Sequence, residues 1–139
     1  MTFEELSKDL PNGFHDAWIK SINLNFKNHS ILIDLDLCVG NPEDVNPDEM
    51  RSGTLKVLSP YLFLIDPPDS KHQLMPSQGS LWIDGDTVKT GQNAELDKFR
   101  TQLPPGACLY RFFVDDWNSF MYFAAAGVEF SWDDEPAKQ

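Results

Sequence analysis

The chain has 139 residues, a length typical of one domain, and we predict a single domain over residues 1–139. Hydrophobic residues make up 41% of it and aromatic residues 12%, which excludes intrinsic disorder. The 22 acidic residues outnumber the 11 basic ones and give a formal charge of -11. This charge disfavours binding to nucleic acids and to anionic membranes, and it allows attraction to a basic protein partner or to divalent cations.

Cysteine usage and the longest apolar runs indicate the compartment. Cys38 and Cys108 lie far apart with no CxxC spacing, so we expect two buried thiols in a reducing compartment, with a disulfide as the alternative. The first ten residues are charged and polar and lack the apolar centre of a secretory signal. The apolar runs at 61–65 and 120–126 are much shorter than the roughly 20 residues of a membrane helix. We therefore predict a cytoplasmic protein of bacterial type.

The first predicted element is a short helix from Phe3 to about Asp9. Thr2 and Glu5 have the spacing of a capping box, in which each side chain bonds the backbone amide of the other residue. The Pro-Asn-Gly segment at 11–13 ends the helix.

A β-hairpin follows. Residues 18–26 and 31–39 alternate at period two, and turn-forming residues separate them. We pair Phe26 with Ile31, which places Phe26 on the buried face, so Phe26→Asp should be severely destabilising. Asp34 and Asp36 then lie on the opposite face, which we interpret as solvent-exposed, with a cation site as the alternative.

The rest of the chain predicts six more strands and a second helix. An acidic loop, 40–52, precedes them, and a polar connection spans 70–78. The helix covers 93–103, is capped by Asn93, and ends at the Pro-Pro-Gly segment that follows. The expected strands are 54–59, 61–65, 80–84, 108–114, 120–125 and 128–132, with Pro60 and Ala126-Gly127 between neighbours, and a frayed tail over 133–139.

These segments predict a mainly β fold, with α+β as the alternative. About eight strands and two short helices with short connections favour sequential antiparallel pairing. We expect an antiparallel β-sandwich or a partly open barrel. Four tryptophans and ten phenylalanines would fill its core, or line a ligand cavity in the barrel alternative.

Two segments contain candidate binding residues. His15 and Asp16 could form a general base and the carboxylate that orients it. Adjacent residues of an extended chain point to opposite sides, however, so we favour a role in fixing how the chain enters the first strand. Asp115, Asp116, Trp117 and Asn118 could lie at the mouth of an aromatic pocket. We favour a turn, because Asp and Asn tolerate the left-handed conformation.

Motifs typical of known enzymes are absent from the sequence. The chain has no P-loop, no G-x-G-x-x-G, no H-E-x-x-H and no nucleophile elbow. Its histidines are scattered at positions 15, 29 and 72, and neither cysteine has a neighbour typical of metal sites. We predict no cofactor and no metal site, and we leave enzymatic activity open while favouring its absence.

Four segments in chain order resemble a family of small uncharacterised bacterial proteins, a domain of unknown function. The first is LPNGFHDA at 10–17 and the last contains DDWNSF at 115–120; LDLCVG at 35–40 and FLIDPPD at 63–69 lie between them. The resemblance implies a compact bacterial domain and transfers no catalytic residue.

Three functions stay open. The first is a non-enzymatic protein-binding domain, for instance an immunity-type protein that masks a basic toxin, because the chain is small, acidic and without catalytic motifs. The alternatives are a small-molecule-binding β-barrel, and a hydrolase or metal-dependent enzyme that uses His15 and nearby acids. Exposed strand edges would also allow a homodimer.

Overall fold

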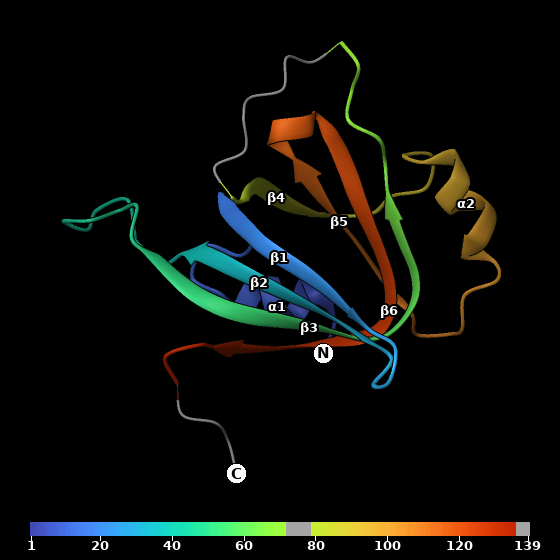
Figure 1. Ribbon diagram of the computed structural model, residues 1–139, viewed down its shortest axis with the longest axis horizontal. Helices are drawn as coiled ribbons and strands as arrows, with labels where there is room; N and C mark the ends of the chain where they lie inside the picture. The colour runs from blue at the N-terminus through green and yellow to red at the C-terminus, as the bar shows by residue number, and fades with distance from the viewer. Residues whose placement is uncertain (72–78, 136–139) are drawn as a thin grey trace.

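A computed structural model describes residues 1–71 and 79–135 (Figure 1). This part contains six antiparallel strands, two short α-helices and one 3-10 turn. In chain order they are α1 (Phe3–Asp9), β1 (Ala17–Asn25), β2 (Ser30–Cys38), β3 (Met50–Ile65), β4 (Leu81–Thr87), α2 (Ala94–Arg100), β5 (Cys108–Val114), η1 (Asp115–Trp117) and β6 (Ser119–Trp132). None of the described helices has the length and apolar character needed to span a lipid bilayer.

The strands form one sheet that closes in a ring, in the order β1-β2-β3-β6-β5-β4. The β1–β4 pairing that closes it is short and joins Ala17–Ile19 to Leu81–Ile83. The prediction of a mainly β, antiparallel fold with two short helices is confirmed. A single closed sheet takes the place of the two packed sheets of a sandwich.

The predicted strand number of about eight is wrong, because two pairs of expected strands are continuous. Segments 54–59 and 61–65 both belong to β3, and segments 120–125 and 128–132 both belong to β6. The two expected interruptions face each other in the sheet: Leu58 lies opposite Gly127 and Pro60 opposite Ala125. A register shift at this point lets both strands bend together while their pairing continues.

The hairpin of β1 and β2 differs from the prediction in its register and in the faces at the start of β1. Leu24, not Phe26, lies opposite Ile31, a shift of two residues that keeps Leu24 on the face of Ile31. A bulge between Ile19 and Ser21 then reverses the alternation, so that Ile19 is buried and Trp18 is exposed. The cause of the two-residue shift is the turn, which begins at Asn25, whose side-chain oxygen accepts a hydrogen bond from the amide of Asn28. Phe26 is therefore a turn residue with 88% of its surface exposed, and the expected severe effect of Phe26→Asp is wrong.

The polar face of the hairpin is as predicted. Asp34 is exposed and Asp36 is half-buried, and the Ser21 hydroxyl donates to Asp34 across the strand pair. Lys20 pairs with Asp36 at 3.1 Å. Both carboxylates thus have partners on this face, in keeping with a solvated surface.

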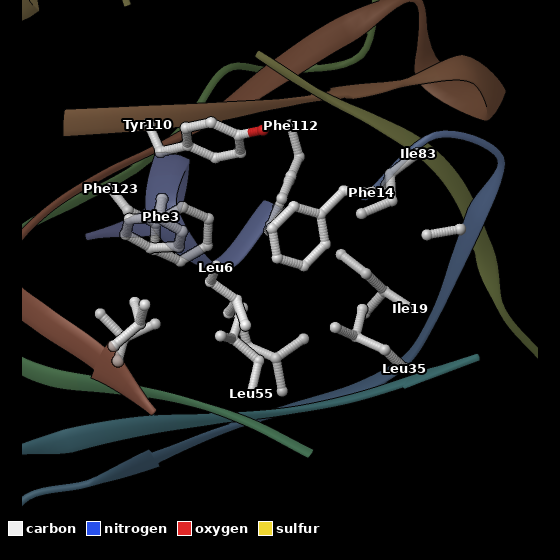
Figure 2. Packing of buried hydrophobic residues seen from close by; sticks show 14 of the residues in the cluster. Phe3, Leu6, Phe14, Ile19, Leu35, Leu55, Ile83, Tyr110, Phe112 and Phe123 are labelled. Atoms are coloured by element: carbon white, nitrogen blue, oxygen red, sulfur yellow. The ribbon is translucent and has the colours of Figure 1, made fainter. Parts of the chain in front are cut away.

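Aromatic side chains fill the interior of the ring (Figure 2). α1 has the predicted capping box and directs Phe3 and Leu6 into the core. The Phe3 ring stacks on Tyr110 with the centroids 5.1 Å apart, and Phe14 meets Phe112 edge to face. The phenylalanine-rich core is as expected for a packed domain, whereas Trp18 lies partly exposed on the outside of the ring.

Three further expectations concern α2, the cysteines and the tail. α2 is shorter than predicted, but Asn93 caps it by accepting a hydrogen bond from the Leu96 amide. Both cysteines are free; Cys108 is buried and Cys38 half-buried. The tail is ordered as far as Glu135, because both carboxylate oxygens of Asp134 accept hydrogen bonds from Arg51 in an ion pair. Most of the expected connection at 70–78 lies outside the described residues, and so do residues 136–139.

Candidate functional site

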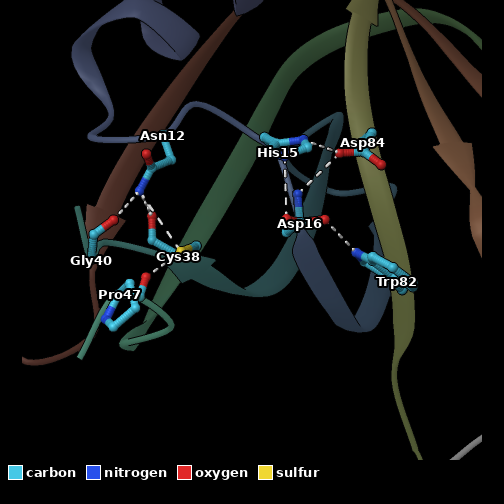
Figure 3. Close-up of polar contacts among 8 residues, drawn as sticks. All are labelled: Asn12, His15, Asp16, Cys38, Gly40, Pro47, Trp82 and Asp84. Atoms are coloured by element: carbon cyan, nitrogen blue, oxygen red, sulfur yellow. Dashed lines mark hydrogen bonds and ion pairs between the residues drawn. The ribbon is translucent and has the colours of Figure 1, made fainter. Parts of the chain in front are cut away.

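His15 and Asp16 point to the same side of the chain, contrary to the sequence-based expectation. Asp16 has a φ of 53°, in the left-handed region, so the backbone is not extended here. The two side chains therefore meet, with His15 Nε2 3.2 Å from Asp16 Oδ2 (Figure 3).

Asp84 of β4 completes a cluster that the sequence analysis missed. Its Oδ1 atom lies 2.6 Å from His15 Nδ1 and also accepts a hydrogen bond from the backbone amide of Asp16. The Trp82 indole donates to Asp16 from the same face of β4 (Figure 3). The cluster joins the start of β1 to β4, but the carboxylate that binds a backbone amide there is that of Asp84, not the expected side chain of His15 or Asp16.

The same three side chains have the chemistry of a cation site. One imidazole nitrogen and two carboxylate oxygens, from His15, Asp16 and Asp84, lie within 4.8 Å of one another. This ligand set suits divalent metals such as Mn²⁺ or Zn²⁺. The His15 side chain is 73% exposed and Asp84 39%. Water therefore has free access to all three groups.

The second predicted group of residues, 115–118, contacts two different parts of the chain. The Asp116 carboxylate accepts a hydrogen bond from the backbone amide of Trp82, which connects it to the β4 end of the cluster. Asn118 adopts the left-handed conformation, as the turn interpretation predicts, and its amide donates to Asp69. Asp115 and Trp117 belong to the 3-10 turn, and Trp117 packs partly against the core. Asp116 and Asn118 thus bind different parts of the chain, Asp116 at β4 and Asn118 at Asp69.

An apolar surface near the β1–β2 turn was not predicted. Two pockets meet there. The hairpin pocket is lined by the polar residues Asn25, His29 and Ser30 and by Leu24, Phe26, Ile31, Pro60, Tyr61, Leu62 and Phe63. The helix pocket is lined by Tyr61, Leu62, Phe99, Gln102, Leu103 and Pro104.

These two pockets share Tyr61 and Leu62, so they form one surface over the second half of β3. The exposed fractions of three large side chains along it are substantial: 88% for Phe26, 48% for Leu24 and 43% for Tyr61. Single exposed apolar residues are ordinary, but several in one place mark an interaction site. The sequence signal that could have revealed it is Phe26, once it is assigned to the turn.

The second half of β3 also has a free edge. Its pairing with β2 ends at Leu58, and the Ser59 amide donates to His29 just beyond. From Pro60 to Ile65, β3 pairs with β6 alone among the described residues. Figure 1 shows this half of β3 turning away from the hairpin, with α2 beside it outside the ring. An unpaired strand edge and an apolar surface thus coincide.

No family model, no curated protein and no solved structure matches this chain. The resemblance of its four segments to a bacterial family stays a prediction.

Proposed function

We propose that the chain is a non-enzymatic protein-binding domain, and that it binds its partner through the hairpin and helix pockets. The observation that supports this proposal is the continuous apolar surface shared at Tyr61 and Leu62. Exposing Phe26 and Leu24 to water is unfavourable, and a partner that covers them removes this apolar area from solvent.

Charge favours a basic partner. The chain has a formal charge of -11, which attracts a basic protein during encounter and makes association sensitive to salt. An immunity-type protein that masks a basic toxin is one specific form of this proposal. A cytoplasmic location fits it, because both thiols are free.

Selection from a random peptide library, with the purified chain as bait, tests the proposal. We expect enriched peptides that bind the wild-type chain and lose about tenfold or more in affinity on Phe26→Ser or Leu24→Ser, the loss typical of interface residues that contribute most to binding. Val45→Ser is the matched control, since Val45 is fully exposed on the acidic loop before β3. Selection of no peptide, or equal binding to all three variants, would contradict the proposal.

The alternative of a small molecule in the ring interior has less support. Phe3, Phe14 and Phe112 are buried at the centre and contact one another or Tyr110. The aromatic side chains that could line a cavity are thus used for packing.

A metal-dependent role is the second candidate, because His15, Asp16 and Asp84 bring three ligand atoms together. The test is titration with Mn²⁺ and with Zn²⁺, followed by calorimetry and, for Mn²⁺, by electron paramagnetic resonance. A site there predicts binding that His15→Gln and Asp84→Asn abolish and that His29→Gln, on the distant hairpin turn, preserves. Equal binding by all variants would reject the site.

A further inference from the structure

Along its free edge, the backbone of β3 presents hydrogen-bonding groups with which no described strand pairs. The Asp66 amide donates to the Phe120 carbonyl, so the backbone groups of residue 66 face β6. Backbone groups alternate in direction along an antiparallel strand, and those of Leu64 therefore face β6 as well. It follows that the N–H and C=O groups of Phe63 and Ile65 face away from β6, where no described strand pairs with them.

This edge is held in the geometry of a sheet. β3 and β6 pair continuously from Leu62 to Ile65. Inside the ring, Phe63 stacks on Phe123 with the centroids 4.8 Å apart and the planes 11° from parallel. An incoming strand would therefore meet a template that is already ordered, which lowers the entropic cost of binding.

The two pockets lie where the side chains of such a strand would point. Successive side chains of a strand project to opposite faces of the sheet. Phe63, opposite the core residue Phe123, belongs to the inner face, and Leu62, opposite Ala124, belongs to the outer face. The hairpin pocket contains both Phe63 and Leu62, so it reaches both faces at the edge of β3. The helix pocket contains Leu62 beside Phe99 but not Phe63, so it lies toward the outer face. Inner-face side chains of an added strand can thus enter the hairpin pocket, and outer-face side chains can enter the helix pocket.

We propose that the chain binds an extended segment of a basic partner by strand addition to the β3 edge at Tyr61–Ile65, with alternate apolar side chains in the hairpin and helix pockets. This inference rests on the proposed function and names its binding mode. The segment is apolar over about five residues, the length of the free edge, and is flanked by Lys or Arg.

The charge of the chain favours a basic partner, rather than a second copy of the chain, as the occupant of the β3 edge. Two copies would each bring a charge of -11 to the contact. The free edge also ends at Asp66, with Asp69 a short distance along the chain, which favours a cation on the incoming segment. A basic segment gains from these charges, whereas a second copy is repelled by them.

The probe is the synthetic peptide Lys-Lys-Val-Phe-Val-Leu-Val-Lys-Lys, whose binding is measured by fluorescence anisotropy. The first control is a pair of peptides with the same sequence and N-methyl groups on alternate central residues. One peptide is methylated at the odd positions and the other at the even positions, which gives the two phases of the strand. N-methylation removes backbone donors and leaves the side chains. We expect one phase to weaken binding to the wild-type chain by about tenfold or more.

Matched variants of the chain test the other side of the contact. Ile65→Pro removes an amide that faces the free edge and leaves the β6 ladder intact, whereas Ile65→Val keeps the amide and most of the apolar surface. Ile65→Pro should lose about tenfold or more in affinity and Ile65→Val about twofold or less. If Ile65→Pro does not fold, the N-methylated peptides on the wild-type chain decide.

The outcomes separate this inference from the proposed function. Peptide binding that resists N-methylation and Ile65→Pro but is lost with Phe26→Ser overturns strand addition and keeps the protein-binding surface. No binding of this peptide to the wild-type chain also overturns the inference, while the library selection decides the proposed function independently. A dimer that sedimentation velocity detects and Ile65→Pro dissociates would assign the edge to a second copy and overturn the basic partner.

Discussion

Phe63 and Phe123 stack face to face inside the ring, and this contact anchors the half of β3 that pairs with β6 alone among the described strands. Phe123 is fully buried, while Phe63 is only partly buried at the border of the core. The free edge is therefore supported from one side by the β6 ladder and from the inner face by this ring pair. A strand without the second support would fray, as unpaired edges do.

Truncation of Phe63 should show how much this anchor contributes. We expect Phe63→Ala to destabilise the chain by about 2–3 kcal/mol, less than the full cost for a buried Phe, because Phe63 is partly exposed. Phe26→Ala is the control and should change stability by about 0.5 kcal/mol or less, since Phe26 is almost fully exposed. Urea denaturation measures both. Equal losses for the two variants would contradict the assigned burial.

The two thiols should react at different rates. Burial raises the pKa of the Cys108 thiol, and its Sγ lies near the Ala125 carbonyl oxygen at 3.3 Å. A higher pKa leaves less of the reactive thiolate, and burial also blocks the reagent. Cys38 is half-buried and more accessible. With Ellman's reagent at about pH 8, one thiol per chain should react quickly, and Cys38→Ser should abolish that fast phase. A fast phase that disappears only with Cys108→Ser would reverse the assignment.

Tyr110 should make the chain sensitive to alkali. Burial raises its pKa above the ordinary value of 10.0, while a hydrogen bond with Ser7 acts in the opposite direction. The unfolded chain releases this proton near pH 10, whereas the folded chain keeps it to higher pH. The contribution of Tyr110 to stability is therefore complete below pH 10 and is lost as the pH rises through the folded-state pKa.

The matched variant for this effect is Tyr110→Phe. Thermal unfolding of both chains from neutral to strongly alkaline pH should show a smaller loss of stability above pH 10 in the variant. Parallel curves would mean that Tyr110 titrates alike in the folded and unfolded chain.

Much of the secondary structure can be predicted from local patterns. The alternation in 18–26 and 31–39 predicts the strands β1 and β2 and their faces near the turn, but not the bulge between Ile19 and Ser21 that reverses the faces at the start of β1. The Thr2–Glu5 spacing predicts the cap of α1. The number of strands cannot be predicted in this way. Pro60 and Ala126-Gly127 have the chemistry of breaks, and they remain within strands because each bend lies opposite the other. Which strand lies opposite is a property of the whole sheet.

The candidate site, too, could be predicted only in part from local sequence patterns. His15 and Asp16 are visible in the sequence, but their meeting depends on the left-handed backbone of Asp16. Asp84 lies 69 residues away from His15 and joins the cluster only because β4 pairs with β1. The free edge of β3 has no local signal at all, since it exists where β2 ends and β6 continues.

Amide hydrogen exchange along β3, followed by NMR, measures the free edge most directly. The amides of Leu64 and Asp66 face β6 and should exchange slowly, whereas those of Phe63 and Ile65 should exchange quickly and become protected when the peptide is added. Slow exchange of Phe63 and Ile65 in the free chain, at the rate of Leu64, would show that this edge is already paired.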